Sequence, residues 1–332
     1  MDNLTHTEIG LFLSRIGLGR WSPGGTAIVV VAANIPDIDV VAAAGGPLTY
    51  LAYHRHLTHS LLLMPVMALA AVAVVRLARR KPVRWAWAFW AALIAVASHL
   101  ALDWTNVYGI RLLLPFSSEW LRADTTSVVD LWIWAVLALG IIGPFLARLV
   151  GSEISSGAAK ERHHGRGFAW FALLLVLFYN GGRRVLHARA VASLASRMYD
   201  GAVPLRTAAM PDVVNPLKWR GIVETPGAFV IQEVNLATDP GNGRGTIFHK
   251  PEAEPAMDVA RRTEAFQGFL RFAQYPLWRV TPYAGMEDGK LVEVFDMRFG
   301  TPLAPGFVAR AVVDSRMRVV ESSFQFGAVR PR

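Results

Sequence analysis

The chain has 332 residues, of which 53% are hydrophobic, and it carries a formal net charge of +9. It contains no cysteine, which excludes disulfides, zinc–thiolate sites and a cysteine nucleophile. Its long hydrophobic runs lie almost entirely within residues 1–182, and basic residues gather beside them, as is typical of charges that flank membrane segments. We therefore expect membrane lipids as partners and no nucleic acid.

The first predicted element is a short helix over residues 4–18, with Thr5 as its N-cap. An apolar run over 26–44 follows, and the sequence Asn-Ile-Pro-Asp-Ile-Asp at 34–39 interrupts it. Pro36 removes one backbone donor and kinks a helix at this point. Carboxylates at membrane depth are tolerated where they line a cavity, which makes the break a candidate site. The alternative is an ordinary helix start in a turn.

Three further apolar runs are predicted to span the membrane, namely residues 61–75, 85–102 and 128–150. The run 168–182 is shorter, and it joins the interrupted run 26–44 as a weaker candidate. The sequence therefore predicts an α-helical multi-pass membrane bundle of about 4–5 apolar helices.

The orientation of this bundle follows from its charges. The loop at 76–84, after the run 61–75, contains five basic residues and no acidic residue. The positive-inside rule places such a loop in the cytoplasm. The other ends of the two adjoining runs then face outward, and they carry the stretch 54–59 on one side and His99 with Asp103 on the other. We therefore expect these polar groups to meet at the outer face of the membrane.

From residue 183 the sequence changes to short segments separated by Pro and Gly, as in a soluble domain. An amphipathic helix is predicted at 185–199 and a second helix at 257–272. Alternating apolar residues predict strands at 222–224, 229–235, 291–299, 308–313 and 318–326. The sequence thus predicts two domains, a membrane-embedded helical domain over 1–182 and a small soluble α+β domain over 183–332.

Ionisable side chains within the apolar segments are candidates for function, because they are costly to leave unpaired in hydrocarbon. His99 and Asp103 are four residues apart, so a helix places them on one face. With His59 and Asp37 they offer nitrogen and oxygen ligands for a divalent metal ion, in the first place zinc, with manganese as the alternative. A lone helical histidine is more often a packed core residue, but several separated His and Asp residues in apolar surroundings favour a metal site.

Several short motifs together resemble a known family. They are Asp2 to His6 followed by Gly10, Asn34-Ile-Pro-Asp37-Ile-Asp39, His54-Arg55-x-x-Thr58-His59-Ser60, and His99-x-x-x-Asp103 followed by Tyr108-Gly109. Over about residues 1–150 they resemble the bacterial membrane-bound, metal-dependent hydrolases known as YdjM-like inner-membrane proteins. The resemblance implies a divalent metal, hydrolysis and a location in the inner membrane. A remoter likeness to zinc-dependent phospholipase C suggests a phosphoester substrate.

We therefore predict a membrane hydrolase with a divalent metal centre. Its predicted metal ligands are His6, Asp37, His59, His99 and Asp103, followed by Asp39 and His54 as ligands or as residues that orient the ligands. The predicted catalytic residues are Asp37, Asp39 and Arg55. A carboxylate would act as general base toward a water molecule that the metal activates, and Arg55 would clamp an anionic group such as phosphate. The substrate class would be a phosphoester or a lipid-type molecule.

The competing hypothesis is a non-catalytic metal-binding membrane protein, either a sensor that regulates another protein or a transporter. A transporter would carry polar residues near the middle of several spans and would contain internal repeats. No repeat is evident, and the polar residues cluster at one end of the predicted spans. This distribution favours the hydrolase. No prediction of oligomeric state follows.

Overall fold

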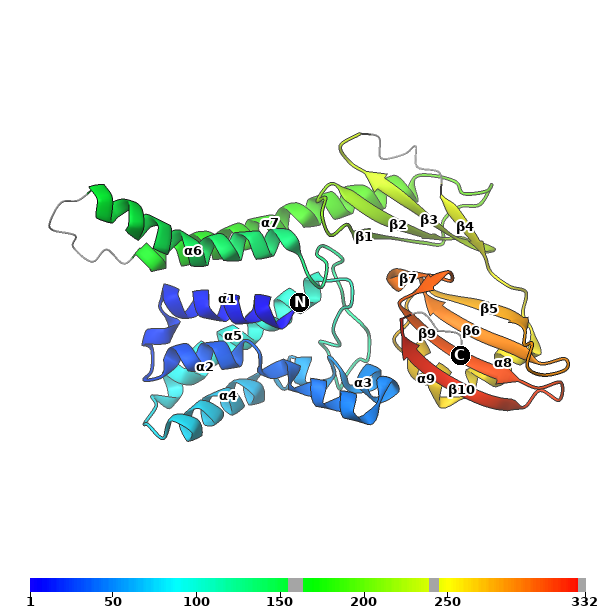
Figure 1. Cartoon of the computed structure of the whole chain (residues 1–332), viewed down its shortest axis with the longest axis horizontal. Helices are drawn as coiled ribbons and strands as arrows, with labels where there is room; N and C mark the ends of the chain where they lie inside the picture. The colour runs from blue at the N-terminus through cyan, green and yellow to red at the C-terminus, as the bar shows by residue number, and fades with distance from the viewer. Residues whose placement is uncertain (155–163, 239–244, 328–332) are drawn as a thin grey trace. The chain divides into compact units, whose positions relative to one another are not determined.

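In the computed structural model of the chain, the described residues are 1–154, 164–238 and 245–327 (Figure 1). The chain divides into two compact units. The first contains Met1–Asp39, Arg55–His187 and Pro211–Pro216, and the second contains Val40–His54, Ala188–Met210 and Leu217–Arg332. The first unit is helical and the second is rich in strands. The predicted domain boundary between residues 182 and 183 stays a prediction.

The first unit is built from α-helices joined by short 3-10 helices. They are α1 (Asn3–Ile16), η1 (Leu18–Arg20), α2 (Gly25–Ala32), the first part of η2 (Ile35–Gly45), η3 (Leu57–His59), α4 (Met64–Arg79), α5 (Trp85–Thr105), α6 (Leu131–Ile154) and most of α7 (His164–Ala195). The predicted N-cap of the first helix is wrong by three residues. Asp2 caps α1, because its carboxylate accepts hydrogen bonds from both the backbone N–H and the hydroxyl of Thr5.

Small residues form the contacts among α2, α4 and α5. One buried cluster contains Ala32, Ala68, Ala71, Ala88, Ala92 and Ala95. Many large apolar side chains point away from this core, including Trp87, Phe145 and Leu177, which are 56%, 61% and 70% exposed. Small residues between helices and large apolar residues outside form the pattern of helices that pack together in lipid.

Among the described residues, two helices are long and apolar enough to cross a membrane, Trp85–Thr105 and Leu131–Leu149. Two helix pairs that are bent at a short break, Gly25–Ala32 with Ile35–Gly45 and Pro47–His59 with Met64–Arg79, raise the number to four if each pair counts as one span. The prediction of a multi-pass helical region is therefore confirmed only as two to four candidate spans. The predicted number of 4–5 is not confirmed.

Two prolines explain part of this difference. The run 26–44 is divided into α2 and η2 just before Pro36, and the run 61–75 becomes helical only at Met64, with Pro65 in the first turn of α4. The run 168–182 lies within the longer helix α7, which is not among the candidate spans of the described chain.

The second unit contains two four-stranded sheets, with the strand orders β1-β2-β3-β4 and β10-β9-β6-β5. The strands are β1 (Arg206–Pro211), β2 (Lys218–Glu224), β3 (Ala228–Asn235), β4 (Thr246–His249), β5 (Pro276–Pro282), β6 (Lys290–Asp296), β7 (Gly300–Thr301), β8 (Ala304–Pro305), β9 (Phe307–Val313) and β10 (Val319–Phe326). Its helices are α3 (Pro47–Tyr53), α8 (Pro255–Arg261), α9 (Glu264–Leu270) and the 3-10 helix η4 (Met297–Phe299). Helices followed by a β-rich C-terminal region confirm the coarse fold class.

Two helix predictions for this region need correction. The predicted helix over 257–272 is two helices, because Thr263 starts a new one by accepting a hydrogen bond from Phe266 N–H at its side-chain oxygen. The predicted helix over 185–199 is not separate. Most of it is the last part of α7, which ends at Ala195.

Candidate metal centre

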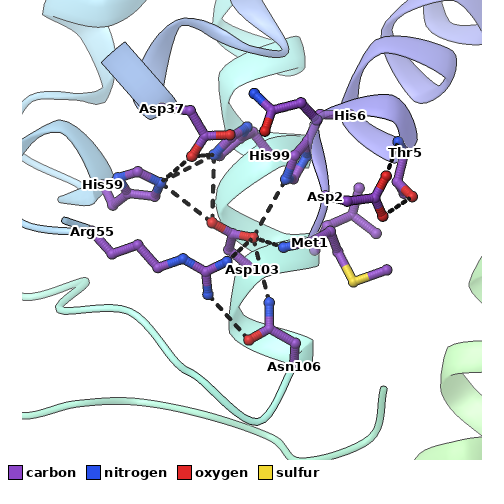
Figure 2. Close-up of polar contacts among 12 residues, drawn as sticks. Met1, Asp2, Thr5, His6, Asp37, Arg55, His59, His99, Asp103 and Asn106 are labelled. Atoms are coloured by element: carbon purple, nitrogen blue, oxygen red, sulfur yellow. Dashed lines mark hydrogen bonds and ion pairs between the residues drawn. The ribbon is translucent and has the colours of Figure 1, made fainter. Parts of the chain in front are cut away.

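Four side chains from three elements of the helical unit converge near the start of α1 (Figure 2). His99 and Asp103 project from α5 one turn apart, His59 ends η3, and Asp37 lies in η2. One ligand atom from each residue lies within 4.8 Å of the corresponding atoms of the other three. His59, His99 and Asp103 are fully buried, and the side chain of Asp37 is 12% exposed.

Five of the six distances between these ligand atoms are close to those in a tetrahedral metal site. His59 Nε2 lies 3.1 Å from His99 Nε2, 3.4 Å from Asp37 Oδ1 and 3.3 Å from Asp103 Oδ2. His99 Nε2 lies 3.6 Å and 3.5 Å from the same two carboxylate oxygens. Four ligands at about 2.0–2.1 Å from a tetrahedral zinc ion are separated by about 3.3–3.4 Å. The four groups are therefore spaced as ligands of one ion.

The far nitrogen of each imidazole ring defines its tautomer. His99 Nδ1 lies 2.8 Å from the carbonyl oxygen of Ala33, which can only accept a hydrogen bond. The proton of a neutral His99 ring is therefore on Nδ1, and the lone pair is on Nε2, which faces the cluster. A backbone carbonyl bound to the far nitrogen is a common partner of metal-ligating histidines.

His59 is oriented in a similar way by Asp39. Asp39 Oδ2 accepts hydrogen bonds from Thr58 Oγ1 at 2.9 Å and from the backbone N–H of Arg55 at 2.7 Å. Because the Thr58 hydroxyl donates its proton to Asp39, it accepts from His59 Nδ1, which is 3.0 Å away. His59 Nδ1 is also 3.2 Å from Asp39 Oδ2. In a neutral His59 ring the Nε2 atom therefore also presents a lone pair, and the arrangement is a carboxylate–histidine pair of the type found behind metal ligands.

Two nitrogen lone pairs and two carboxylate oxygens thus meet at one buried point. Asp103 Oδ2 is a buried oxygen that accepts no hydrogen bond from the described residues. A buried acceptor without a hydrogen bond is costly, and a divalent cation would bind this oxygen together with the other three ligand atoms. A set of two imidazoles and two carboxylates suits zinc. The same ligands can bind manganese, but manganese has less preference for tetrahedral coordination.

Arg55 and Asn106 hold the other side of Asp103. Arg55 Nη2 lies 3.1 Å from Asp103 Oδ1, and Arg55 Nη1 donates to Asn106 Oδ1 and to the carbonyl of Gly109, both at 3.1 Å. The amino group of Met1 also contacts Asp103 Oδ1. These contacts leave Oδ2 of Asp103 directed at His59 and His99. Arg55 is 3% exposed, so the structure assigns it a positioning contact with Asp103, and its role as a phosphate clamp stays a prediction.

The remaining predicted ligands lie outside the group of four. The ring of His6 stacks on His99 at 3.8 Å between centroids, and its Nε2 is 3.4 Å from Asp103 Oδ1. Asp39 stands behind His59, as described above. The ring of His54 stacks on Tyr50 at 4.5 Å. The roles of His6 and His54 as ligands stay predictions.

Sequence reasoning missed two partners of the site. Asn106 lies three residues after Asp103, and its amide is 3.5 Å from Asp103 Oδ1, but an uncharged side chain gives little signal beside a carboxylate. The carbonyl of Ala33 is a backbone group and leaves no signal in the side-chain pattern. Its availability could be inferred only from the helix break that precedes Pro36.

The cluster lies in the part of the chain that matches a known family. Residues 1–190 match the family model described as YdjM inner membrane protein. Over 324 residues the chain is 23% identical to the protein YfhP of Bacillus subtilis (strain 168), which is described as uncharacterized, and the match covers 93% of this chain and 90% of that protein. No solved structure matches the chain. All four residues of the cluster fall within the matched segment.

Proposed function

The chain belongs to the family of YdjM inner membrane proteins, and on this premise we propose that it is a membrane-bound, divalent-metal-dependent hydrolase. The observation that carries the proposal is the close approach of one ligand atom each from Asp37, His59, His99 and Asp103. Zinc is the proposed ion and manganese the alternative. A divalent ion held there would polarise a phosphoryl or carbonyl oxygen and lower the pKa of a water molecule.

The residues of the site have distinct proposed tasks. Asp39 keeps the ring of His59 oriented through Nδ1, and Arg55 keeps one oxygen of Asp103 away from the cluster. Asp37 is the one residue of the four whose side chain retains exposure, so water and substrate would enter beside it. We therefore propose Asp37 as the carboxylate that accepts a proton from the attacking water, with Asp39 in the supporting role.

We propose that the cluster faces the outer leaflet and acts on a lipid or phosphoester substrate. Support for the orientation comes from the helix ends. α1 and α4 run from the cluster toward Arg15 and Arg79, and α5 returns from Trp85 to the cluster (Figure 1). The basic ends are therefore opposite the cluster, and basic ends favour the cytoplasm. Support for the substrate class is the depth of the cluster among apolar helices.

A non-catalytic metal site is the second candidate, and the burial of the ligand residues favours it. Structural and sensory zinc sites have four protein ligands, whereas catalytic sites keep one position open for water. Here four protein groups are available, and three of them are fully buried. A protein that senses a metal ion in the membrane would show tight binding without turnover.

Metal analysis tests the site first. The full chain is purified in detergent without chelators, and its metal content is measured by elemental mass spectrometry. We expect about one divalent ion per chain, lost in His59→Ala and in Asp103→Asn. His56→Ala is the matched control, because His56 lies in the same stretch but outside the group of four. Equal metal content in all four proteins would refute the ligand assignment.

Turnover then separates the two candidates. The protein in vesicles is given zinc or manganese and tested on labelled phospholipids and on soluble phosphodiesters. Hydrolysis that disappears in Asp37→Asn and persists in His56→Ala supports the hydrolase. Stoichiometric metal with no turnover of any substrate supports the sensor and contradicts the hydrolase.

A further inference from the structure

A basic cavity of about 580 Å³ lies at the opposite end of the helical unit from the metal cluster. It is bordered by the last turn of α1, by η1 and by the helices α6 and α7. Four guanidinium groups line it, those of Arg15, Arg20, Arg148 and Arg166. Within the described part of the chain, no carboxylate lines the cavity and none of the four forms an ion pair with one. Four cations that have no carboxylate partner among the described residues form a candidate site for an anion.

Part of the lining of the cavity is apolar. Ile141, Pro144 and Phe145 of α6 line it, and Ile141 and Phe145 are 37% and 61% exposed. Polar groups also reach it, since Ser14 donates its hydroxyl proton to Thr26 Oγ1 at 2.8 Å and Thr26 keeps its own proton for another acceptor. Cations and hydroxyls beside an exposed apolar helix match a molecule with an anionic head and a hydrocarbon tail.

The cavity also lies at the level of a membrane interface. The segment that follows η1 contacts the basic loop between α4 and α5, because Arg84 N–H donates a hydrogen bond to Ser22 Oγ at 2.9 Å. Trp21 meets Trp87 edge to face at 5.7 Å. Tryptophans and arginines at one end of a helical bundle mark the depth of lipid headgroups. Figure 1 shows the turns from α1 to α2 and from α4 to α5 at this same end.

We propose that this cavity binds the phosphate headgroup of an anionic phospholipid, with phosphatidylglycerol as the test case. The guanidinium groups bind the phosphate oxygens, and an acyl chain lies along Ile141 and Phe145. Basic pockets between helices on the cytoplasmic side of a membrane are suited to such headgroups. The site is separate from the metal cluster and goes beyond the proposed hydrolysis, because His6 and Arg15 lie at opposite ends of α1.

Native mass spectrometry of the detergent-solubilised full chain tests the proposal. Phosphatidylglycerol and phosphatidylcholine with identical acyl chains are titrated separately, and inorganic phosphate is then added as a competitor. We expect phosphatidylglycerol to bind at least about tenfold more tightly than phosphatidylcholine, because charge-assisted hydrogen bonds to the headgroup distinguish the two. We expect millimolar phosphate to displace little of it, since phosphate lacks the acyl chain.

Paired variants locate the binding. In Arg15→Gln/Arg148→Gln we expect affinity for phosphatidylglycerol to fall about tenfold or more. The matched control Arg79→Gln/Arg84→Gln removes the same charge at the same end of the bundle but outside the cavity, and its affinity should stay within about twofold of the parent. Phe145→Ser should weaken lipid binding while all four arginines remain. A monodisperse elution profile and unchanged metal content show that each variant is folded.

Three results would overturn the proposal. Equal binding of the two lipids would remove the headgroup preference. An equal loss of lipid affinity in the cavity variant and in the control variant would show that binding depends on the total positive charge and not on the cavity. Full displacement of the lipid by inorganic phosphate would show that the cavity takes the free anion instead.

Discussion

The Nε2 atoms of His59 and His99 face each other at 3.1 Å, and when both rings are neutral the hydrogen bond at the far nitrogen of each ring leaves its Nε2 without a proton. Two lone pairs at that distance repel each other unless a cation lies near both. Asp37 and Asp103 add negative charge at the same point. Metal binding should therefore decide whether this part of the helical unit is stable.

Removal of the metal should lower thermal stability. A ligand present at about a thousand times its dissociation constant stabilises the folded state by about 4 kcal/mol. Chelation of the purified protein should therefore lower the melting temperature, and added zinc should restore it. The measurement is a thermal shift in detergent with and without chelator. His59→Ala should melt at the same temperature under both conditions, and a chelator effect that persists in this variant would contradict the assignment.

Asp39→Asn should weaken metal binding without abolishing it. Loss of a carboxylate behind a metal-ligating histidine typically costs about 10–100-fold in metal affinity. The amide that replaces the carboxylate has nearly the same shape and still fits between Thr58 and Arg55, so the fold should be retained. Competition with a chromophoric zinc chelator measures the affinity. Asp37→Asn should lose more affinity than Asp39→Asn, and the reverse order would exchange the proposed roles of the two carboxylates.

Arg55→Gln should destabilise the helical unit more than Arg55→Lys. Removing one partner of a buried ion pair typically costs about 3–5 kcal/mol, because the other charge is left uncompensated. Lysine keeps the charge beside Asp103 but cannot reach Asn106 and Gly109 together. Thermal unfolding of the metal-free proteins measures the difference. Equal stability of Arg55→Gln and the parent would point to a substrate clamp instead of a positioning residue.

Protonation of Glu224 in acid should remove a small part of the stability of the second unit. Burial alone would raise the pKa of Glu224, but hydrogen bonds from Lys250 and Arg206 outweigh burial and hold this pKa below the ordinary value of 4.5. The contribution of ionised Glu224 to the stability of the folded state is therefore fully present above about pH 4.5, and it is lost as the pH falls through the lowered pKa. Exposure of Arg206 limits it to about 1 kcal/mol or less.

The check is thermal unfolding of the parent and of Glu224→Gln between about pH 3 and 7, followed by the circular dichroism of the strands. The difference in melting temperature between the two proteins should shrink as the pH is lowered. A difference that stays constant across this range would show that Glu224 titrates as in the unfolded chain.

The four residues of the candidate metal site could be selected from the sequence more readily than the helix breaks. Asp37, His59, His99 and Asp103 could be selected because each is ionisable and lies in or beside an apolar run. Their convergence is specified by tertiary packing, and only the spacing of His99 and Asp103 on one helix could be anticipated. The predicted number of spans was not confirmed, because hydropathy continues past Pro36 and Pro65 although the helix is interrupted near each of them.

The supporting contacts were harder to predict for a physical reason. Arg55 looked like a substrate ligand, because sequence shows its charge and not its burial. In the structure that charge faces Asp103, which an isolated sequence pattern could not pair with it over a separation of 48 residues. The orientation of His99 depends on a backbone carbonyl, which every residue possesses.

The hydrogen bond from Arg55 N–H to Asp39 Oδ2 joins positions 16 residues apart and closes the segment between them into a loop. Asp37 precedes this loop and His59 follows it, so one ion bound to both residues would fasten its two ends together. Such a metal clip removes chain entropy from the unfolded state in the manner of a crosslink, by an amount that grows slowly with loop length. Metal binding would thus hold both ends of the segment 40–54. The segment belongs to the other compact unit, and none of its side chains is a member of the metal site.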